Sequence, residues 1–478
     1  MAALDVPAIL TRPRLWQMIG VLILVEVLSS LENAMIFTAL PKIHAEFNDI
    51  TRVGWLISGF LLAQAGTAAI GGRLGDLLGR RRVLVIIALL CGVGSLISAL
   101  GTNLEVIILG RVLQGASGAI LPLCFGVVRE IAPAKDTPFW VGTLTGAWGV
   151  AHALGFVLGG VLSDLGGWHL IFYCTAAYAF ALLLPLLTIL PPTRPAGLSG
   201  GLDLGGLLFV PAVVSVLYGL MQTHEQGWDS AQAYGFLAGG AALLGFWAWR
   251  EYRHPSPLID VKLLLKKGIL LGNLCYVLMA LGLGQSAVML MLLLQQPTWT
   301  GVGLGVTATV AGALKIPSSL SGAFAGPWAG FVCGRWTPRW AIVQGAALSL
   351  AAWLSILFFH ERLWQVVAAS IVSSIGITII QSAIPNAVLL HTPPERSSEA
   401  TGVSIVIKAV FTAVGLQLAT ILLSLSQATD PQTNVSFPSE TAFNMVFAYI
   451  CLTAAAMLSV CLLIPKEHWR KEELAVSD

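Results

Sequence analysis

Charged residues are scarce in this sequence, making up only 10% of its 478 positions. Soluble domains usually contain about 25% Asp, Glu, Lys and Arg, whereas 56% of this chain is hydrophobic. This composition predicts an all-α polytopic membrane protein with the lipid bilayer as its main partner. The formal net charge of +2 is too small to indicate a nucleic-acid partner or an acidic substrate.

Paired cysteines and nucleotide-binding motifs are also lacking. The seven cysteines are isolated from one another, so neither a zinc site nor a disulfide framework is indicated. There is no metal-ligand cluster, P-loop or nucleophile elbow, which argues against an enzyme and against ATP-driven transport. We expect no cofactor. The N-terminus lacks a separate apolar core with a cleavage site, so we expect a retained first helix and not a signal peptide.

Long apolar runs fill most of the chain. A spanning helix needs about 20 mostly apolar residues, and this length predicts fourteen transmembrane segments. They lie at 16–38, 51–71, 83–101, 104–128, 139–162, 168–190, 203–222, 232–250, 268–294, 301–325, 340–359, 363–389, 401–426 and 441–464. Lys and Arg gather in alternate loops, which predicts cytoplasmic termini in a multi-pass protein of the plasma membrane or the bacterial inner membrane.

Two breaks in composition divide the chain into three predicted parts. A Pro/Gly linker (191–203) and a charged segment (249–268) flank an inserted helix pair. We therefore expect an N-terminal six-helix bundle at 1–190, the linker and inserted pair at 191–267, and a C-terminal six-helix bundle at 268–478. Repeated six-helix bundles are one way in which secondary transporters are built.

The stretch GRLGDLLGRRR runs from Gly72 to Arg82, between the second and third segments. Glycines such as Gly79 permit a tight turn there. Asp76 can accept hydrogen bonds from N–H groups at a helix start, and arginines such as Arg80 hold the loop in the cytoplasm. From these residues alone, the stretch is either a mechanical element or a loop that only fixes topology.

A second stretch, LGRVLQGASGAILP (109–122), places an arginine within a spanning segment. Arg111 and Gln114 are about one turn apart and share a helix face. The arginine either acts inside the bundle or extends its head group to the membrane surface.

These two stretches resemble signatures of the major facilitator superfamily, G-x-L-a-D-r-x-G-r-r in loop 2–3 and R-x-x-q-G in the fourth helix. The resemblance implies the major facilitator fold, a latch made by Asp76 and Arg80 with Gly72 and Gly79, and a link between Arg111 and proton coupling. A second copy of the loop, AGFVCGRWTPRWA (329–341), has Gly334 in place of the acid. We therefore expect the latch on one side only.

The arrangement of six, two and six helices resembles the drug:proton antiporter branch of that family. LENAMIFTALP (31–41) is similar to the branch signature L-D-x-T-I-V-N-V-A-L-P, with Glu32 at the acid. PPERSSEATGVSIVIKAVFTAVG (393–415) resembles the entry to helix 13, with Lys408 where arginine is usual. One departure leaves the direction of transport open, because Phe156 replaces the proline of the fifth-helix signature.

Several ionisable residues lie within apolar segments. Glu26 shares a helix face with Ser29, Ser30 and Asn33, and Glu32 lies roughly 60° beyond it. Burial disfavours the ionised form of a carboxyl, so Glu26 and Glu32 are candidate proton-coupling groups, or neutral acids that only join helices. His152 is either a proton relay or a hydrogen-bonded structural residue.

Lys315 lies near the centre of a predicted span, where it is a counter-ion, a substrate contact or one half of a structural salt bridge. The other predicted residues of the substrate cavity offer polar groups or soft apolar surface. They are Asn33, Gln114, Trp148, Phe156, Gln285, Met289, Gln381 and Lys408.

Taken together, the residues and the resemblance predict a proton-coupled transporter that exports amphipathic small molecules or drugs by alternating access. The proton gradient supplies its energy, and we expect a monomer. Phe156 and Lys315 favour an alternative, a carrier or importer of a lipid-like or anionic metabolite. A non-transporting membrane sensor is a further alternative, against which the lack of a soluble domain counts.

Overall fold

The structure is a computed structural model that describes residues 12–47, 50–192, 204–226, 230–254, 257, 259–306, 308–429 and 436–465. Apolar segments form helices because backbone groups in hydrocarbon must find their hydrogen-bond partners within the segment. The N-terminal group consists of α1 (Arg12–Phe47), α2 (Ile50–Leu78), α3 (Arg80–Leu100), α4 (Leu104–Gln114), η1 (Gly115–Ala119), α5 (Ile120–Ile131) and α6 (Thr137–Thr188).

Four further elements connect this group to the rest of the chain. They are η2 (Leu204–Leu208), α7 (Phe209–Gln226), α8 (Ala231–Arg253) and α9 (Val261–Leu264). The C-terminal group consists of α10 (Lys267–Leu281), η3 (Leu283–Gln285), α11 (Ser286–Gln295), η4 (Thr298–Thr300), α12 (Ala308–Arg335), α13 (Pro338–Phe358), α14 (Leu363–Leu390), η5 (Pro394–Arg396), α15 (Ser397–Ser424) and α16 (Glu440–Cys461).

The described residues contain nine helices that are long and apolar enough to cross a membrane, or ten if the bent pair α10–α11 counts as one span. The helix α6 is counted once here, although Gly166 and Gly167 interrupt it with non-helical backbone. That break separates the predicted segments 139–162 and 168–190. The chain is therefore a multi-pass helical protein, and the count of fourteen spans stays a prediction.

Two predicted spans are less regular than expected. Segment 104–128 contains the 3₁₀ turn η1 after Gln114. Segment 268–294 bends by 42° between α10 and α11. Each break lies next to a glycine, a residue that disfavours the interior of a helix.

The predicted span 301–325 is wrong at both ends, because α12 runs from Ala308 to Arg335. Gly301 has a φ of 83° and Gly305 a φ of 63°. These left-handed conformations end any helix and favour glycine. They hold the segment before α12 in an irregular loop.

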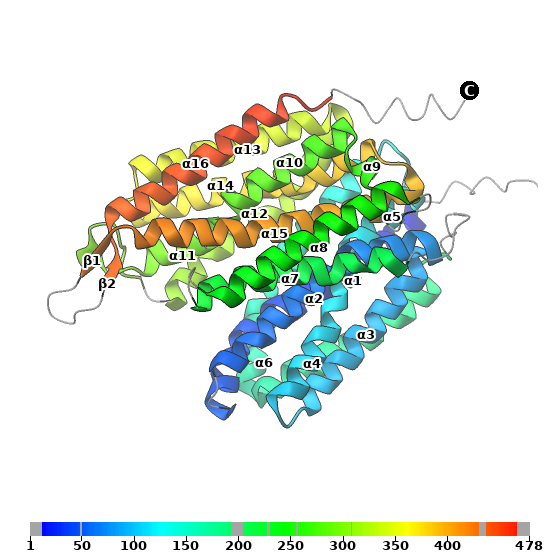
Figure 1. The fold of residues 1–478 in the computed structure, drawn as a ribbon, viewed down its shortest axis with the longest axis horizontal. Helices are drawn as coiled ribbons and strands as arrows, with labels where there is room; N and C mark the ends of the chain where they lie inside the picture. The colour runs from blue at the N-terminus through cyan, green and yellow to red at the C-terminus, as the bar shows by residue number, and fades with distance from the viewer. Residues whose placement is uncertain are drawn as a thin grey trace, which may run out of the picture.

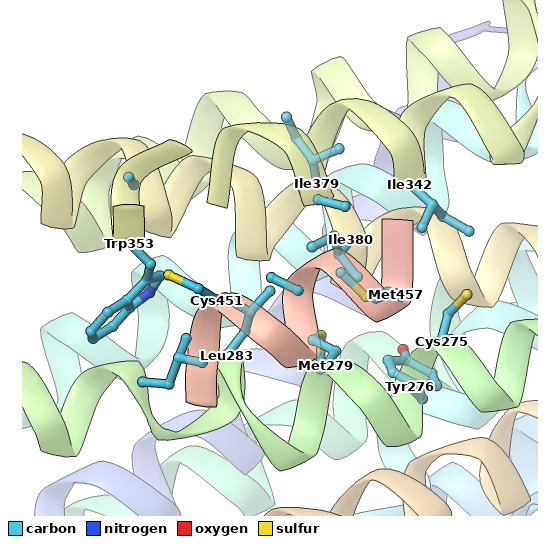
Figure 2. Packing of buried hydrophobic residues seen from close by; sticks show 14 of the residues in the cluster. Cys275, Tyr276, Met279, Leu283, Ile342, Trp353, Ile379, Ile380, Cys451 and Met457 are labelled. Carbon is cyan, nitrogen blue, oxygen red and sulfur yellow. The ribbon is translucent and has the colours of Figure 1, made fainter. Parts of the chain in front are cut away.

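Each helix group has its own apolar core. Two clusters of buried side chains lie within α1–α6, apart from one residue of α14. The largest cluster belongs to the C-terminal group and includes Trp353, Met279 and Tyr276, which Figure 2 shows packed between helices. Separate cores allow the two groups to behave as separate bodies.

The two groups meet along two seams, which we call the α2–α15 seam and the α6–α12 seam. In Figure 1 the blue and cyan helices lie below the yellow to red ones, with green α7 and α8 between them. A fourth apolar cluster joins α2, α7 and α15 through Leu62, Val213 and Val403, so the inserted pair covers the α2–α15 seam.

Glycines allow the helices at both seams to approach closely. A Cβ atom on Gly72 would lie 2.3 Å from the backbone oxygen of Ser398, and one on Gly142 would lie 2.2 Å from that of Gly326. Small residues at such contacts are typical of tight helix packing in membranes.

The polar segment 426–444 of the sequence allows either a hairpin or a disordered loop. Its described residues form a hairpin in which β1 (Gln427–Thr429) pairs antiparallel with β2 (Ser436–Pro438). Most of the predicted linker 191–203 lies outside the described residues, and the division at 190 and 267 stays a prediction.

Candidate functional site

The predicted latch residues lie together at the α2–α15 seam and form what we call the latch cluster. The Nη2 atom of Arg80 lies 2.7 Å from Asp76 Oδ1. Its Nε donates to Ser398 Oγ at 3.0 Å, which carries the contact from one helix group to the other. Gly79, with a φ of 97°, makes the turn between α2 and α3 that aims Arg80 back at Asp76.

Asp76 also caps a helix of the other group. Its Oδ2 accepts a hydrogen bond of 2.9 Å from the backbone N–H of Glu399, in the first turn of α15. A carboxylate is favourable there because the first N–H groups of a helix lack partners and carry partial positive charge. The sequence predicted such a cap, although not the helix that receives it.

Further charges extend the latch cluster. Arg73 Nη1 lies 3.1 Å from Glu399 Oε2, and Arg80 also pairs with Glu130. From the inserted segment, the backbone N–H of Asp260 donates to Glu399 Oε1 at 2.7 Å. The sequence analysis missed these partners, because only the fold brings them beside Asp76. An acid in the first turn of α15 was the one local signal.

Gly334 lies in the last turn of α12, at the position where the second copy of the loop lacks its acid. No salt bridge among the described residues involves the neighbouring Arg335 or Arg339. This agrees with a latch on one side.

Glu32 belongs to a second group of residues, the Glu32 cluster, which lies inside the N-terminal group of helices. Ser95 Oγ of α3 donates to Glu32 Oε1 at 3.5 Å and accepts from Gln114 Nε2 at 2.6 Å. The second carboxyl oxygen of Glu32 is buried without a hydrogen bond. An acid with one free oxygen in an apolar setting is suited to bind and release a proton.

Arg111 completes this cluster and does not reach the surface, since it is 1% exposed. Its Nη1 donates to the backbone oxygen of Glu32 at 3.0 Å and to Gln114 Oε1 at 2.7 Å. Its Nε donates to Leu56 O at 3.0 Å, and its guanidinium lies 4.1 Å from the ring centroid of Phe60. The arginine thus ties α1 and α4 to α2.

Glu26 does not join the Glu32 cluster. It is 1% exposed, its Oε2 makes no hydrogen bond, and the Cys124 thiol of α5 is among its neighbours. Of the residues expected to share its face, Ser30 donates to the backbone oxygen of Trp148 at 3.4 Å, and Asn33 is half-buried.

A third set of residues, the interface cluster, lies between the two helix groups. Trp148, His152 and Phe156 follow one another at four-residue spacing along α6. The rings of Trp148 and His152 stack with centroids 5.2 Å apart, and those of His152 and Phe156 meet edge to face at 5.4 Å. They form an aromatic face on the N-terminal side.

The C-terminal group brings two lysines to this face. Lys408 Nζ lies 5.6 Å from the ring centroid of Trp148 and donates to Gln381 Oε1 at 3.2 Å. Lys315 lies close enough to His152 for an electrostatic interaction. The structure therefore brings together six residues that the sequence analysis named separately.

Two predicted cavity residues lie elsewhere. Gln285 donates to the backbone oxygens of Ala280 and Thr412, at 2.9 Å and 3.0 Å, within the bend between α10 and α11. Met289 is 1% exposed in the core of the C-terminal group. Both positions are explained by packing.

The α6–α12 seam was not singled out by the sequence analysis. Gly142 and Gly146 on α6 face Gly322, Gly326 and Gly330 on α12. The four-residue spacing of these glycines was the signal that could have found it.

Two groups of apolar helices that meet around polar residues form the architecture of a secondary membrane transporter. The family model of the Major Facilitator Superfamily matches residues 22–416. The chain belongs to this family. It is therefore a membrane transporter and not an enzyme, and the predicted fold class is confirmed.

Individual proteins agree with this assignment. The chain is 27% identical to a probable actinorhodin transporter of Streptomyces coelicolor over 87% of this chain and 74% of that protein. It is 26% identical to the multidrug resistance protein Stp of Mycobacterium tuberculosis over 92% of this chain and 82% of that protein.

Among solved structures, the fold is similar to that of a proton:xylose symporter bound to 6-bromo-6-deoxy-D-glucose. The TM-score is 0.67 at 14% identity, covering 96% of this chain and 97% of that one. At this identity the likeness supports the fold alone.

Proposed function

We propose that this protein is a proton-coupled antiporter that exports amphipathic small molecules by alternating access. The names of its relatives, an antibiotic transporter and a multidrug resistance protein, support export of such compounds. The moving bodies are the bundles at 1–190 and 268–478, joined by the linker and inserted pair at 191–267. Both termini lie in the cytoplasm.

The carboxyl group of Glu32 carries the proposal. One of its oxygens is buried without a partner and the other meets Ser95. Protonation removes a charge at this point, and Arg111 joins the same helix to Leu56 on α2. Because α2 ends in the latch cluster, a change at Glu32 has a direct path to the contacts that hold the two helix groups together.

Glu26 is the second proposed proton site, since its carboxyl is equally buried and has one oxygen without a hydrogen bond. It lies apart from Arg111 and Gln114, so its protonation acts on the packing of α1 against α5. In this proposal Glu32 is the main coupling group, and Glu26 modulates it.

The experiment reconstitutes the full chain in liposomes that contain a pH-sensitive dye. Two amphipathic probes that share a pyrene ring, one with a carboxylate and one with a trimethylammonium group, are offered on one side. For the native chain, transport of at least one of the two probes is expected to drive a counterflow of protons. Glu32→Gln is expected to abolish it, because an amide cannot carry the proton, and Glu26→Gln to weaken it.

Glu46→Gln is the matched control on the same helix. Glu46 is exposed and, among the described residues, accepts a hydrogen bond from Trp168 of the same helix group, at 2.7 Å. Its replacement is expected to leave proton counterflow unchanged. Proton counterflow that persists in both the Glu26→Gln and Glu32→Gln proteins would show that the coupling assignment is wrong.

A further inference from the structure

The interface cluster holds two cations without a balancing acid. No salt bridge among the described residues involves Lys315 or Lys408. Among the described residues, Lys408 donates to the neutral amide of Gln381, and Lys315 donates to the backbone oxygen of Ala287 at 3.5 Å. Both side chains are half-buried.

Several other cations among the described residues are paired with acids, whereas the buried Arg111 donates to neutral oxygens beside Glu32. Arg73 lies 3.1 Å from Glu399, Arg80 lies 2.7 Å from Asp76, and even the partly exposed Arg396 lies 2.6 Å from Asp260. An unpaired charge at membrane depth is costly and usually marks a ligand or ion path. The contrast indicates that Lys315 and Lys408 receive their counter-ion from outside the chain.

The carboxylates of α1 do not fill this role. Glu32 is directed into the N-terminal group, toward Ser95, and Glu26 lies beside Cys124. Both are buried there, at 2% and 1% exposure. The interface cluster therefore presents positive charge only.

The opposite wall of the cluster is aromatic. The stacked rings of Trp148 and His152 are nearly parallel, at 19°. Lys408 Nζ lies over the ring of Trp148, and Lys315 is within electrostatic range of His152. The Nδ1 of His152 is buried without a hydrogen bond.

Phe156 extends this wall and is 42% exposed, with Phe37 of α1 at a centroid distance of 5.9 Å. A planar ring stacks well on such a surface, and an ammonium group is a compact charge for carboxylates and similar acids.

We propose that the interface cluster binds an amphipathic organic anion, with its acidic group on Lys315 and Lys408 and its planar aromatic body against Trp148 and His152. This rests on the proposed function, because it names the substrate class of the transport site. A cation at this cluster would be repelled by the positive charges of Lys315 and Lys408.

Binding is measured with the full chain in nanodiscs of zwitterionic lipid, using the fluorescence anisotropy of three pyrene probes. They share the ring and the chain length and end in a carboxylate, its neutral amide or a trimethylammonium group. The carboxylate is expected to bind about ten- to hundredfold more tightly than the amide, as for a charge-assisted hydrogen bond in a partly buried site. The trimethylammonium probe is expected to bind more weakly than the amide.

The double variant Lys315→Gln/Lys408→Gln is expected to lose the preference for the carboxylate while its affinity for the amide stays the same. Lys315→Arg/Lys408→Arg, which keeps both charges, is expected to retain the preference. Trp148→Ala is expected to weaken the carboxylate and the amide alike. Lys267→Gln, at an exposed lysine outside the cluster, is the matched control.

The comparison of the three probes on the native chain decides the charge preference even if a variant fails to fold. Equal or tighter binding of the trimethylammonium probe would overturn the proposal, as would an unchanged carboxylate preference in the folded double Gln variant. Nanodiscs with added anionic phospholipid test whether a lipid headgroup is the ligand instead. If the pyrene probes no longer bound in nanodiscs with anionic phospholipid, and Trp148→Ala had no effect on their binding, the proposed contact between the aromatic body and Trp148 would be wrong.

The outcomes separate this proposal from proton coupling. Carboxylate binding that depends on the lysines, without proton counterflow, would support the substrate class and contradict the antiport mechanism. Proton counterflow driven by the trimethylammonium probe alone would support antiport and contradict the anion site.

Discussion

Arg111 joins three helices through its planar, forked head group. It donates to Leu56, Glu32 and Gln114 at 2.7–3.0 Å and lies over the ring of Phe60. A lysine carries the same charge at a single point and cannot reproduce this fork or the flat contact with the ring. The shape of the side chain matters here as much as its charge.

We therefore predict that Arg111→Lys lowers the free energy of unfolding by about 1–3 kcal/mol, the range for leaving a buried polar partner unsatisfied. Thermal unfolding in detergent measures this change. Proton counterflow should fall as well, because the link from Glu32 to α2 is broken. Arg82→Lys, at an exposed position, is the control, and equal stability of the Arg111→Lys and native proteins would show that the fork is not needed.

Contacts within one helix could be predicted at this scale, and contacts between helices could not. The spacing of Arg111 and Gln114 predicted a shared helix face, and the structure joins the two side chains by a hydrogen bond. The approach of Lys408 to Trp148 depends on how two distant helices pack, which the periodicity of neither helix contains. Met289 is buried in the core, and an apolar residue of the core cannot be told from an apolar residue of a cavity wall by sequence alone.

Glu399 links elements from all three parts of the chain. It pairs with Arg73 of α2, accepts from the backbone of Asp260 before α9, and offers its own N–H to Asp76. The inserted helix pair is therefore connected to the latch cluster as well as covering the α2–α15 seam. Removing the charge of Glu399 leaves Arg73 buried and unpaired.

We predict that Glu399→Gln destabilises the closed latch by about 3–5 kcal/mol, the range for breaking one side of a buried ion pair. Hydrogen exchange should rise at residues 72–80 of α2 and around Asp260, as well as in the first turn of α15. Thermal stability should fall in parallel.

Glu395→Gln is the matched control, because Glu395 is exposed one turn before Glu399. Its hydrogen exchange is expected to match that of the native chain. Faster exchange confined to α15 in the Glu399→Gln protein would contradict a latch that spans all three parts.

For individual elements, the length of an apolar run predicted the presence of a helix better than it predicted the residue at which the helix begins. The apolar run 301–325 includes Gly301 and Gly305, whose positive φ angles exclude a helix. Hydropathy does not register backbone conformation, so the predicted span began too early and stopped before the true end of α12 at Arg335. The charged turn at Gly79, by contrast, was predicted because its glycine and arginines are local signals.

For the whole molecule, the family fold could be predicted because its motifs are local, while the facing state could not. The latch cluster contacts Asp260 beside α9, and Gly330 of α12 faces Pro138 in the first turn of α6, which follows α5. Both contacts lie toward the end of the molecule where α5 and α9 are labelled in Figure 1. With the predicted cytoplasmic termini, that end faces the cytoplasm. We therefore infer that the structure corresponds to an outward-facing conformation.

On this interpretation, closure of the α6–α12 seam determines to which side of the membrane the molecule is open. A Cβ atom on Gly326 would lie 2.3 Å from the backbone oxygen of Gly142, so a larger side chain cannot fit while the seam is closed. We predict that Gly326→Leu disfavours the closed seam by about 1–3 kcal/mol, the usual range for overpacking. Each 1.4 kcal/mol changes the ratio of outward to inward conformations roughly tenfold.

A single reporter cysteine at Gln381 measures that ratio. Cys174, the one half-buried cysteine, is replaced by serine, and the other six are buried. A membrane-impermeant maleimide should label the reporter from outside in the native background and from the cytoplasmic side in the Gly326→Leu protein. Gly239→Leu, where a Cβ meets nothing within 4 Å, is the control. Labelling of the native background from the cytoplasmic side would reverse the assigned facing, and unchanged sidedness in Gly326→Leu would show that closure of this seam does not set it.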